Sequence, residues 1–209
     1  MERARILLAD DHALMLDGFC NLLQPTNDVL GTAGDGRTLV DSALRLNPDL
    51  IILDITMPVL NGIDAAREIR KHLPLVKILF VTMHTSPAYL QAALEAGANG
   101  YAVKSSDRAR ILEAVETVLS GQRYVSPGVG GEHLDRWEDP ARAAASLRLS
   151  ARERQILQLT AEGKSRKEVA FALGISEKTV AFHKDNLKNK LGLRSTAQLT
   201  RYALDTGLI

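Results

Sequence analysis

Cysteine and long apolar runs are both scarce in this chain of 209 residues. Cys20 is its one cysteine and has no partner for an internal disulfide, while the five histidines are scattered without a zinc-binding spacing. A disulfide-stapled fold and a structural zinc site are therefore excluded. No run of about 18 apolar residues occurs, so we expect no membrane span. The apolar stretch at residues 6–9 is too short, and too acidic at its end, for a signal peptide, which predicts a cytoplasmic protein.

Length and charge divide the chain into two parts. Its 209 residues exceed the usual size of one domain, about 100 to 150 residues, and its 45% hydrophobic and 24% charged residues are typical of a globular protein. Residues 1–122 carry 11 Lys or Arg against 15 Asp or Glu, a net charge of −4, whereas residues 148–209 carry 12 against 6, a net charge of +6. A basic module behind an acidic one predicts a polyanionic partner for the C-terminal part only.

The first 120 residues alternate short apolar runs with amphipathic helical patterns. Five apolar runs, mostly without polar alternation, indicate parallel strands covered on both faces: residues 5–9, 29–33, 50–54, 76–82 and 100–103. Five segments with apolar residues three and four apart indicate helices: residues 12–24, 36–46, 62–72, 87–96 and 107–120. Five βα units in succession predict an α/β fold, with a doubly wound, five-stranded parallel sheet, for a domain spanning residues 1–122.

The pattern changes twice beyond this domain. Residues 123–147 contain several prolines and glycines with little periodicity, which is typical of a linker, although the Ala-rich residues 141–146 leave a structured helix as an alternative. Residues 148–209 indicate four helices, the first of which opens at Ser150 with the spacing of a capping box. A tight turn at residues 174–176 joins the second helix to the third. This all-α, four-helix pattern predicts a helix-turn-helix for the DNA major groove.

Polar side chains follow the predicted strands, and the carboxyl ends of parallel strands meet at one edge of a sheet. The residues at the five ends are Asp10 with Asp11, Asp35, Asp54, Thr82 and Lys104. An aspartate after a strand commonly caps the next helix, and we expect that role for Asp35. Asp10 and Asp11 repel one another unless a cation joins them, and an oxygen-only site suits Mg²⁺. We therefore expect a magnesium site at this edge.

This constellation resembles the receiver domain of response regulators, which has a flavodoxin-like fold. The similarity is carried by Asp10-Asp11, by Leu53-Asp54-Ile55-Thr56-Met57-Pro58 followed by Gly62, by Thr82 and by Tyr101-Ala102-Val103-Lys104. The resemblance implies that Asp54 accepts a phosphoryl group. It implies that Mg²⁺ is held by Asp10, Asp11, Asp54 and Thr56, the last through its carbonyl. It also implies that Thr82 and Lys104 bind the phosphoryl group and that Tyr101 is the switch aromatic.

The C-terminal residues 148–209 are similar to LuxR-type helix-turn-helix domains. The match is carried by Leu149-Ser150-Ala151-Arg152-Glu153-Arg154, Gly163-Lys164-Ser165, Lys167-Glu168-Val169-Ala170, Ile175-Ser176, Thr179-Val180, His183 and Lys190-Leu191-Gly192. A receiver followed by this module resembles the NarL/FixJ class of transcriptional response regulators. On the recognition helix we expect DNA contacts from Lys178, Thr179, Phe182, His183, Lys184 and Lys188, with the lysines binding phosphates.

The chain departs from these family patterns at three positions. Ser105 follows the site lysine where many receivers have a proline, often after a cis peptide, so the geometry of this peptide does not follow from the resemblance. Ala181 and Asp185 occupy recognition-helix positions where members of the class often carry lysines. Phosphate binding is therefore better supported than any base preference. Two interpretations of Phe182 stay open, contact with thymine methyls and packing beneath the DNA.

Together these features predict a DNA-binding transcriptional regulator that is not an enzyme and that a sensor histidine kinase phosphorylates on Asp54. We expect three partners: the kinase, double-stranded DNA and a second copy of the chain, since such domains usually act as dimers on paired half-sites. A regulator that works without phosphorylation and a protein-interaction adaptor are alternatives. A phosphatase of the haloacid dehalogenase type is disfavoured, because it would carry a second aspartate where this chain has Thr56.

Overall fold

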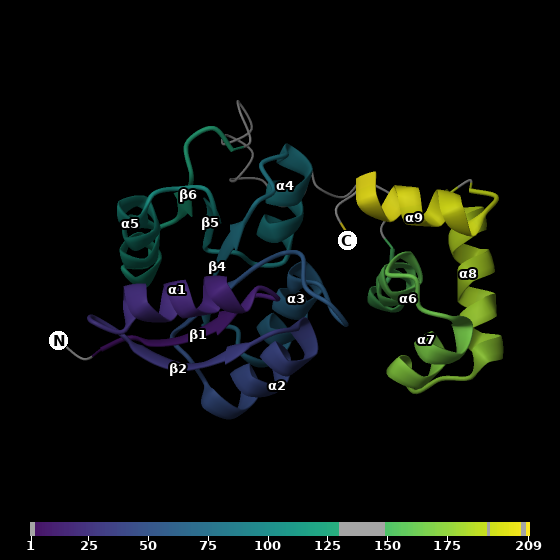
Figure 1. Cartoon of the computed structure of the whole chain (residues 1–209), viewed down its shortest axis with the longest axis horizontal. Coiled ribbons are helices and arrows are strands. Elements are labelled where there is room, and N and C mark those ends of the chain that lie inside the picture. The colour runs from purple at the N-terminus through teal and green to yellow at the C-terminus, as the bar shows by residue number, and fades with distance from the viewer. Residues whose placement is uncertain (1–2, 130–148, 192, 206–207) are drawn as a thin grey trace. The chain divides into compact units, whose positions relative to one another are not determined.

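A computed structural model describes residues 3–129, 149–191, 193–205 and 208–209 of the chain (Figure 1). These residues form two compact units, and the division between them falls within residues 130–148. The first unit combines a sheet with helices, and the second is helical. Among the described residues, the structure contains no helix long and apolar enough to cross a membrane.

The first unit is built on a parallel sheet of six strands. In chain order the strands are β1 (Arg5–Ala9), β2 (Asp28–Ala33), β3 (Leu50–Leu53), β4 (Lys77–Thr82), β5 (Gly100–Val103) and β6 (Tyr124–Val125). Their order across the sheet is β2-β1-β3-β4-β5-β6, and every neighbouring pair is parallel. The chain reverses its winding direction beside β1, so the crevice at the carboxyl ends of β1 and β3 is the topological switch point of the sheet.

The sixth strand corrects the expectation of a five-stranded sheet. Tyr124 and Val125 lie within the range predicted as linker, yet they pair with Gly100 and Tyr101 of β5. Tyr124 is only 9% exposed and packs into the core beneath the sheet. Two residues are too few to show a strand periodicity, which is why the sequence did not reveal β6. Most of the predicted linker, residues 130–147, lies outside the described residues.

Helices cover both faces of the sheet, as expected for a doubly wound fold. They are α1 (Ala13–Leu23), α2 (Gly36–Leu46), α3 (Gly62–His72), α4 (Pro87–Glu95) and α5 (Arg108–Leu119). One apolar cluster joins α1 and α5 to side chains such as Ile6 and Leu79, and a second joins α2, α3 and α4 to side chains such as Leu7 and Ile78. Alternate residues of a strand thus enter opposite layers, which explains why the strands are apolar throughout.

Asp35 has the structural role that its position predicts. Its carboxylate accepts hydrogen bonds from the backbone N–H groups of Arg37 and Thr38, both at 2.8 Å, and from the Thr38 hydroxyl at 2.7 Å. These contacts satisfy donors that are otherwise unpaired at the start of α2. The helix-cap interpretation of Asp35 is therefore confirmed, and its carboxylate is occupied by the start of this helix.

The second unit consists of α6 (Ala151–Ala161), α7 (Arg166–Leu173), α8 (Glu177–Leu191) and α9 (Thr196–Asp205). The predicted capping box at Ser150 is present, and Ser165 forms another at the start of α7. Gly174 ends α7 with φ at 62°, a left-handed conformation that glycine adopts without steric cost. Side chains from all four helices share one apolar core. The α7–turn–α8 segment is thus the predicted helix-turn-helix.

Candidate functional site

The carboxyl edge of the sheet gathers most of the residues that the sequence singled out. Asp10 directly follows β1, Asp54 follows β3, Thr82 ends β4 and Lys104 follows β5. Asp10, Asp54 and Thr82 are all buried, although two of them are carboxylates. Burying charge is costly unless a partner of opposite charge is present, so their surroundings determine whether this site is stable.

Lys104 supplies the opposite charge. Its ammonium Nζ lies 2.6 Å from Asp10 Oδ2 and 2.7 Å from Asp54 Oδ2, and the three side chains are only 3–7% exposed. Burial alone would lower the pKa of Lys104, but the hydrogen bonds to Asp10 and Asp54 outweigh it and hold the pKa above its ordinary value. The ammonium is therefore charged at neutral pH and bridges two carboxylates that come from different strands.

The backbone around Asp54 is held from both sides. Its N–H donates to the carbonyl of Ala9 at 3.0 Å, and its Oδ1 accepts from the N–H of Ile55 at 2.6 Å. Gly62, at the start of α3, packs directly on this strand end. A Cβ atom on Gly62 would lie 1.9 Å from the carbonyl oxygen of Asp54, so any larger residue forces the backbone to move. The glycine of the motif thus permits the close approach that positions Asp54.

Asp10, Asp11 and His12 form a group whose ligand atoms all lie within 4.8 Å of one another. His12 Nδ1 is 2.7 Å from Asp11 Oδ1 and 3.3 Å from Asp10 Oδ1, and the His12 N–H donates to Asp10 Oδ1 at 3.0 Å. Asp54 is linked to this group through Lys104. The sequence analysis did not predict a site role for His12. Its position directly after two aspartates is the feature that would have indicated one.

The remaining predicted residues meet at His84, in the loop after β4. The N–H of His84 points to Thr82 Oγ1 at 3.4 Å, and the hydroxyl of Tyr101 donates to the His84 carbonyl at 2.9 Å. Tyr101 is fully buried, and this burial, with smaller contributions from Tyr89 and Asp54, raises the pKa of its hydroxyl. One peptide segment therefore connects the predicted phosphate-binding hydroxyl to the predicted switch aromatic.

The side chain of His84 is also fixed. Its Nε2 shares a hydrogen bond of 2.9 Å with Thr56 Oγ1, and its ring stacks on Tyr89 with 3.8 Å between ring centroids. Burial lowers the pKa of His84, against the opposing influence of Asp54. The histidine is therefore a half-buried bridge between the loops after β3 and β4. The partner ring at Tyr89 had no signal in the sequence.

The departure at Ser105 has a simple structural outcome. The Lys104–Ser105 peptide is trans, as is every other peptide bond in the described part of the chain. Lys104 still reaches both carboxylates, and its backbone N–H donates to the carbonyl of Thr82 at 2.8 Å. The position of the ammonium thus does not depend on proline after the lysine.

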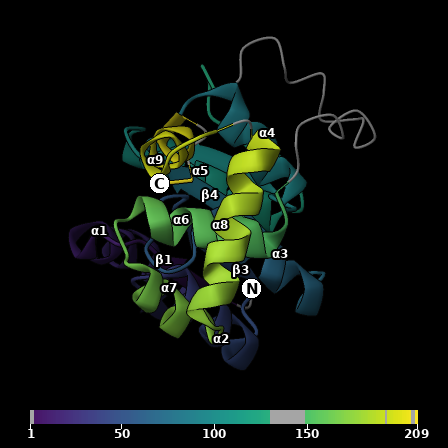
Figure 2. The same ribbon diagram turned by 90° about the vertical axis from the view of Figure 1, so that its right-hand side faces the viewer.

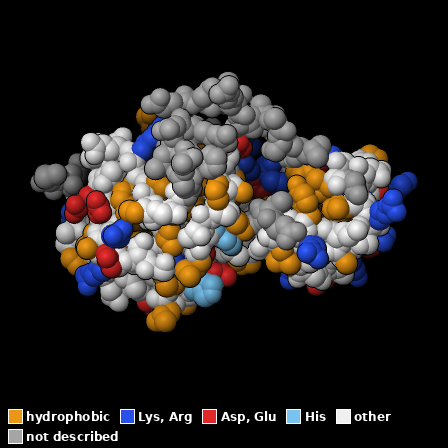
Figure 3. Space-filling model, turned by 90° about the horizontal axis from the view of Figure 1, so that it is seen from above, with side chains coloured by type: hydrophobic (Ala, Val, Ile, Leu, Met, Phe, Trp, Pro, Cys, Tyr) orange, Lys and Arg blue, Asp and Glu red, His pale blue; other side chains and the backbone are white. Residues whose placement is uncertain are grey.

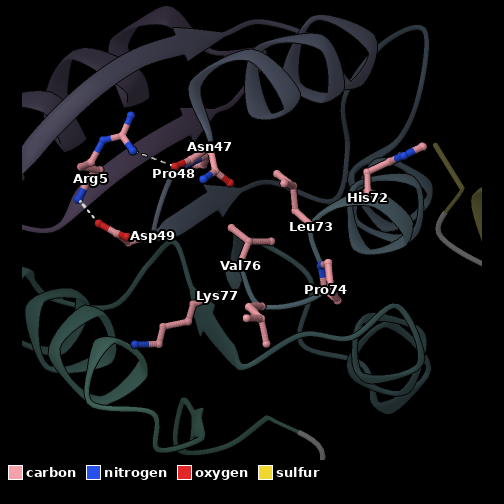
Figure 4. Close-up of a pocket in the computed structure, with 10 residues that line it drawn as sticks. Arg5, Asn47, Pro48, Asp49, His72, Leu73, Pro74, Val76 and Lys77 are labelled. Atoms are coloured by element: carbon pink, nitrogen blue, oxygen red, sulfur yellow. Dashed lines mark hydrogen bonds between the residues drawn. The ribbon is translucent and has the colours of Figure 1, made fainter.

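A pocket of about 410 Å³ lies away from this site, at the amino end of the sheet (Figure 4). It is lined by residues that include Arg5 and Lys77, which begin β1 and β4, and Asp49, which precedes β3. Arg5 is held by the Asn47 carbonyl at 3.0 Å, and its own N–H donates to Asp49 Oδ2 at 2.8 Å. None of the predicted site residues lines this pocket. It lies at the edge of the sheet opposite to the one that carries Asp10, Asp54 and Lys104.

The candidate nucleic-acid interface is α8, which packs against α6 and α7 (Figure 2). Val180 and Leu187 are fully buried in the core of the unit, whereas Lys178 is exposed and Phe182 is 62% exposed. The ring of Phe182 contacts His183 edge to face, with 5.8 Å between centroids. Phe182 is therefore a surface side chain, not a core residue.

The other predicted contact residues of α8 are partly engaged within the unit. The hydroxyl of Thr179 bonds to Ser176 at 2.8 Å, and Lys188 forms an ion pair with Asp185 at 2.6 Å. Burial lowers the pKa of Lys184, and the neighbouring cations Arg166 and Lys188 lower it further. Lys and Arg side chains project from this unit in the space-filling view (Figure 3).

The chain is similar to known proteins over nearly its whole length. Residues 6–116 match the response regulator receiver domain, and residues 147–203 match the luxR family of bacterial regulatory proteins. The transcriptional regulatory protein MctR of Rhizobium johnstonii is 39% identical over 99% of this chain and 96% of its own length. The oxygen regulatory protein NreC of Staphylococcus aureus is 36% identical over 98% and 99%.

A solved structure is similar to this chain over almost its full length. The RcsB response regulator of Salmonella typhimurium has a TM-score of 0.68 at 27% identity, with 99% of each chain covered. The chain therefore belongs to the NarL/FixJ class of two-component response regulators, which act as transcriptional regulators.

Proposed function

We propose that Asp54 is the phosphoacceptor through which a sensor histidine kinase controls DNA binding by α8. The main support is the pair of ionic contacts from Lys104 to Asp54 and Asp10. They place a positively charged ammonium beside a buried carboxylate at the topological switch point of the sheet. A carboxylate oxygen attacks phosphorus only when charge on the transferred group is offset. Lys104 is placed to provide part of that offset.

The site also fits Mg²⁺. Asp10 and Asp11 offer oxygen ligands within 4.8 Å of one another, and hard oxygen donors are the ligands that this cation prefers. We assign its binding to Asp10, Asp11, Asp54 and the carbonyl of Thr56. When bound, the ion supplies further positive charge to the phosphoryl oxygens. In the transfer itself, Asp54 forms the new O–P bond as the P–N bond of the kinase phosphohistidine breaks, the kinase imidazole leaves, and Lys104 pairs with a transferred oxygen.

Phosphorylation is transmitted through the backbone of His84. A phosphoryl group on Asp54 adds about −1.5 to −2 charge and new acceptor oxygens. The hydroxyl of Thr82 donates to one of them. Its Oγ1 therefore turns away from the His84 N–H, and the same peptide segment carries the carbonyl that binds Tyr101. The surface formed by α4 and β5 changes as a result.

The output of the switch is DNA binding by the helical unit. Lys178, Lys184 and Lys188 bind phosphates, and Thr179, Phe182 and His183 lie beside them on the recognition helix. RcsB of Salmonella enterica has been solved bound to promoter DNA in the presence of the phosphomimetic BeF3⁻, at a TM-score of 0.62 and 27% identity. This chain is similar to that protein over 96% of its own length, which supports double-stranded DNA as its partner.

We further propose that the DNA-bound form is a homodimer. The 15 residues of α8 span about 22 Å at 1.5 Å per residue, which is enough for only a few base pairs. Two copies on paired half-sites give the specificity that one helix does not. The proposed domain limits are residues 1–122 for the receiver core, to which β6 is appended, and 148–209 for the DNA-binding domain.

Intact-mass measurement tests the acceptor. The full-length protein is incubated with a small-molecule phosphodonor and Mg²⁺, with and without a chelator. We expect the mass of one phosphoryl group on the wild type, none on Asp54→Asn and none with chelator. Asp35→Asn is the matched control, because this aspartate also follows a strand but caps a helix, and it should label normally. Labelling of Asp54→Asn at the wild-type level would refute the assignment.

A further inference from the structure

The solvent-facing stripe of α8 has an aromatic ring near its middle. Lys178, Phe182, Asp185 and Asn189 are spaced four, three and four residues apart, so they lie on one side of the helix, and all four are exposed. Val180 and Leu187 occupy the opposite, buried side. This stripe is therefore the part of α8 that a DNA groove can reach.

Charge indicates that the middle of the stripe, at Phe182 and Asp185, meets base edges and not the phosphate backbone. Asp185 lies one turn after Phe182 and its side chain is 68% exposed, and a carboxylate close to phosphates is repelled. The cations that suit phosphates lie beside the stripe. Lys184, Lys188 and Arg166 of α7 form this basic flank, and both Arg166 and Lys188 are close enough to repel the charge of Lys184. The basic flank therefore holds the backbone while Phe182 is directed into the groove.

We propose that Phe182 is a specificity residue that selects thymine by packing its ring against the C5-methyl group. A phenyl ring neither donates nor accepts a conventional hydrogen bond, so it cannot read the polar edge of a base. Thymine alone presents a methyl group in the major groove of unmodified DNA. This inference rests on the proposed DNA-binding function, and it names the base feature that the function uses.

The neighbours of Phe182 strengthen this assignment. Lysine or arginine on the recognition helix commonly contacts guanine, but this chain has Ala181 before the ring and Asp185 after it. Asp185 is further held by Lys188 at 2.6 Å. At the centre of the stripe, apolar contact is thus the available means of recognition.

The chain offers a matched control in Phe171. It is 91% exposed and belongs to the same helical unit, but it lies on α7 and not on the recognition helix. Replacing either phenylalanine by alanine removes an exposed ring of the same size. Because neither ring is in the apolar core, both variants should keep the fold, and Phe182→Leu preserves an apolar side chain at the proposed contact.

The test removes the methyl group without changing the base pair. A binding site is first selected from random duplex DNA with the full-length phosphorylated protein, and each thymine is then replaced in turn by deoxyuridine. Wild type should lose about fourfold in affinity for one methyl group, the equivalent of one buried CH₂ group. Phe171→Ala should show the same loss and Phe182→Leu part of it. Phe182→Ala should bind the thymine and uracil sites equally.

The possible failures are distinct. If wild type selects a site but no thymine methyl affects affinity, or if Phe182→Ala retains the full loss, the methyl contact is refuted while the proposed function stands. If the phosphorylated protein selects no sequence at all, both the proposed function and this inference are overturned.

Discussion

Lys104 and Asp54, fifty positions apart in the chain, are joined by a contact of 2.7 Å between Nζ and Oδ2. The same ammonium lies 2.6 Å from Asp10 Oδ2. Two buried carboxylates would repel one another without this cation, so Lys104 stabilises the fold and also prepares the site for a doubly charged phosphoryl group.

Lys104→Met should therefore destabilise the receiver unit at pH 7 by about 3 kcal/mol, the usual cost of breaking a buried ion pair. Because the pKa of Lys104 is raised on folding, its contribution is complete below the unfolded value of about 10.4 and is lost as pH rises through the folded value. Urea unfolding of wild type and variant at pH 7 and at a series of pH values above about 10.4 measures this difference. Lys71→Met, at an exposed position of α3, should change little, and an equal effect of both variants would contradict the ion-pair argument.

Gly62→Ala tests the close packing behind Asp54. The new methyl would lie 1.9 Å from the carbonyl oxygen of Asp54, so the strand end must move. We expect a loss of about 1–3 kcal/mol, typical of overpacking, together with slower phosphorylation of Asp54. The control is Gly18→Ala, where nothing lies within 4 Å of the added Cβ in α1, and it should gain up to about 1 kcal/mol from helix propensity. Thermal unfolding and phosphodonor labelling measure both effects.

Tyr101→Phe removes the hydroxyl that donates to the His84 carbonyl. The loss should be about 1 kcal/mol, because the partly buried carbonyl of His84 loses its hydrogen-bond donor, while Asp54 should still accept phosphate. Hydrogen exchange of the loop after β4 should become faster, and its response to phosphorylation should shrink. If that response were unchanged, Tyr101 would not be the switch aromatic.

Glu153→Gln tests the ionic contact that links the start of α6 to the end of α8. Glu153 completes the capping box with Ser150 and lies 3.0 Å from Lys190 at the end of α8. Although burial acts in the opposite direction, the hydrogen bonds to Ser150 and Lys190 lower the pKa of Glu153. Its contribution is therefore present above the unfolded pKa of about 4.3 and is lost as pH falls through the folded value. Hydrogen exchange of α6 amides in the full-length variant should show a loss of about 1 kcal/mol at pH 7 that shrinks as pH falls below about 4.3, whereas a loss of constant size down to low pH would contradict this.

The sequence predicted the fold and the charged part of the site because both depend on regular spacing. Apolar runs identify the strands, and each polar residue directly after a run marks the same edge, so Asp10, Asp54 and Lys104 could be brought together without coordinates. Asp35 also directly follows a strand, yet it caps a helix and is not part of the site. The sequence analysis predicted this role as well.

The features that could not be predicted from the sequence depend on contacts between residues whose spacing follows no regular pattern. β6 has two residues and exists only because β5 offers an edge to pair with. The stack of His84 on Tyr89 and the bond of His84 to Thr56 join three loop or helix positions whose spacing carries no signal. The exposure of Phe182 likewise became clear only from the packing of α8.

The central claim is that phosphorylation of Asp54 controls DNA binding, and a paired affinity measurement tests it most directly. Wild type and Asp54→Asn are titrated onto one selected DNA site at fixed salt with Mg²⁺, each with and without phosphodonor. The account predicts that the phosphodonor tightens binding by wild type and leaves Asp54→Asn unchanged. The same increase in affinity for both proteins, or tight binding by wild type that does not respond to the donor, would contradict it.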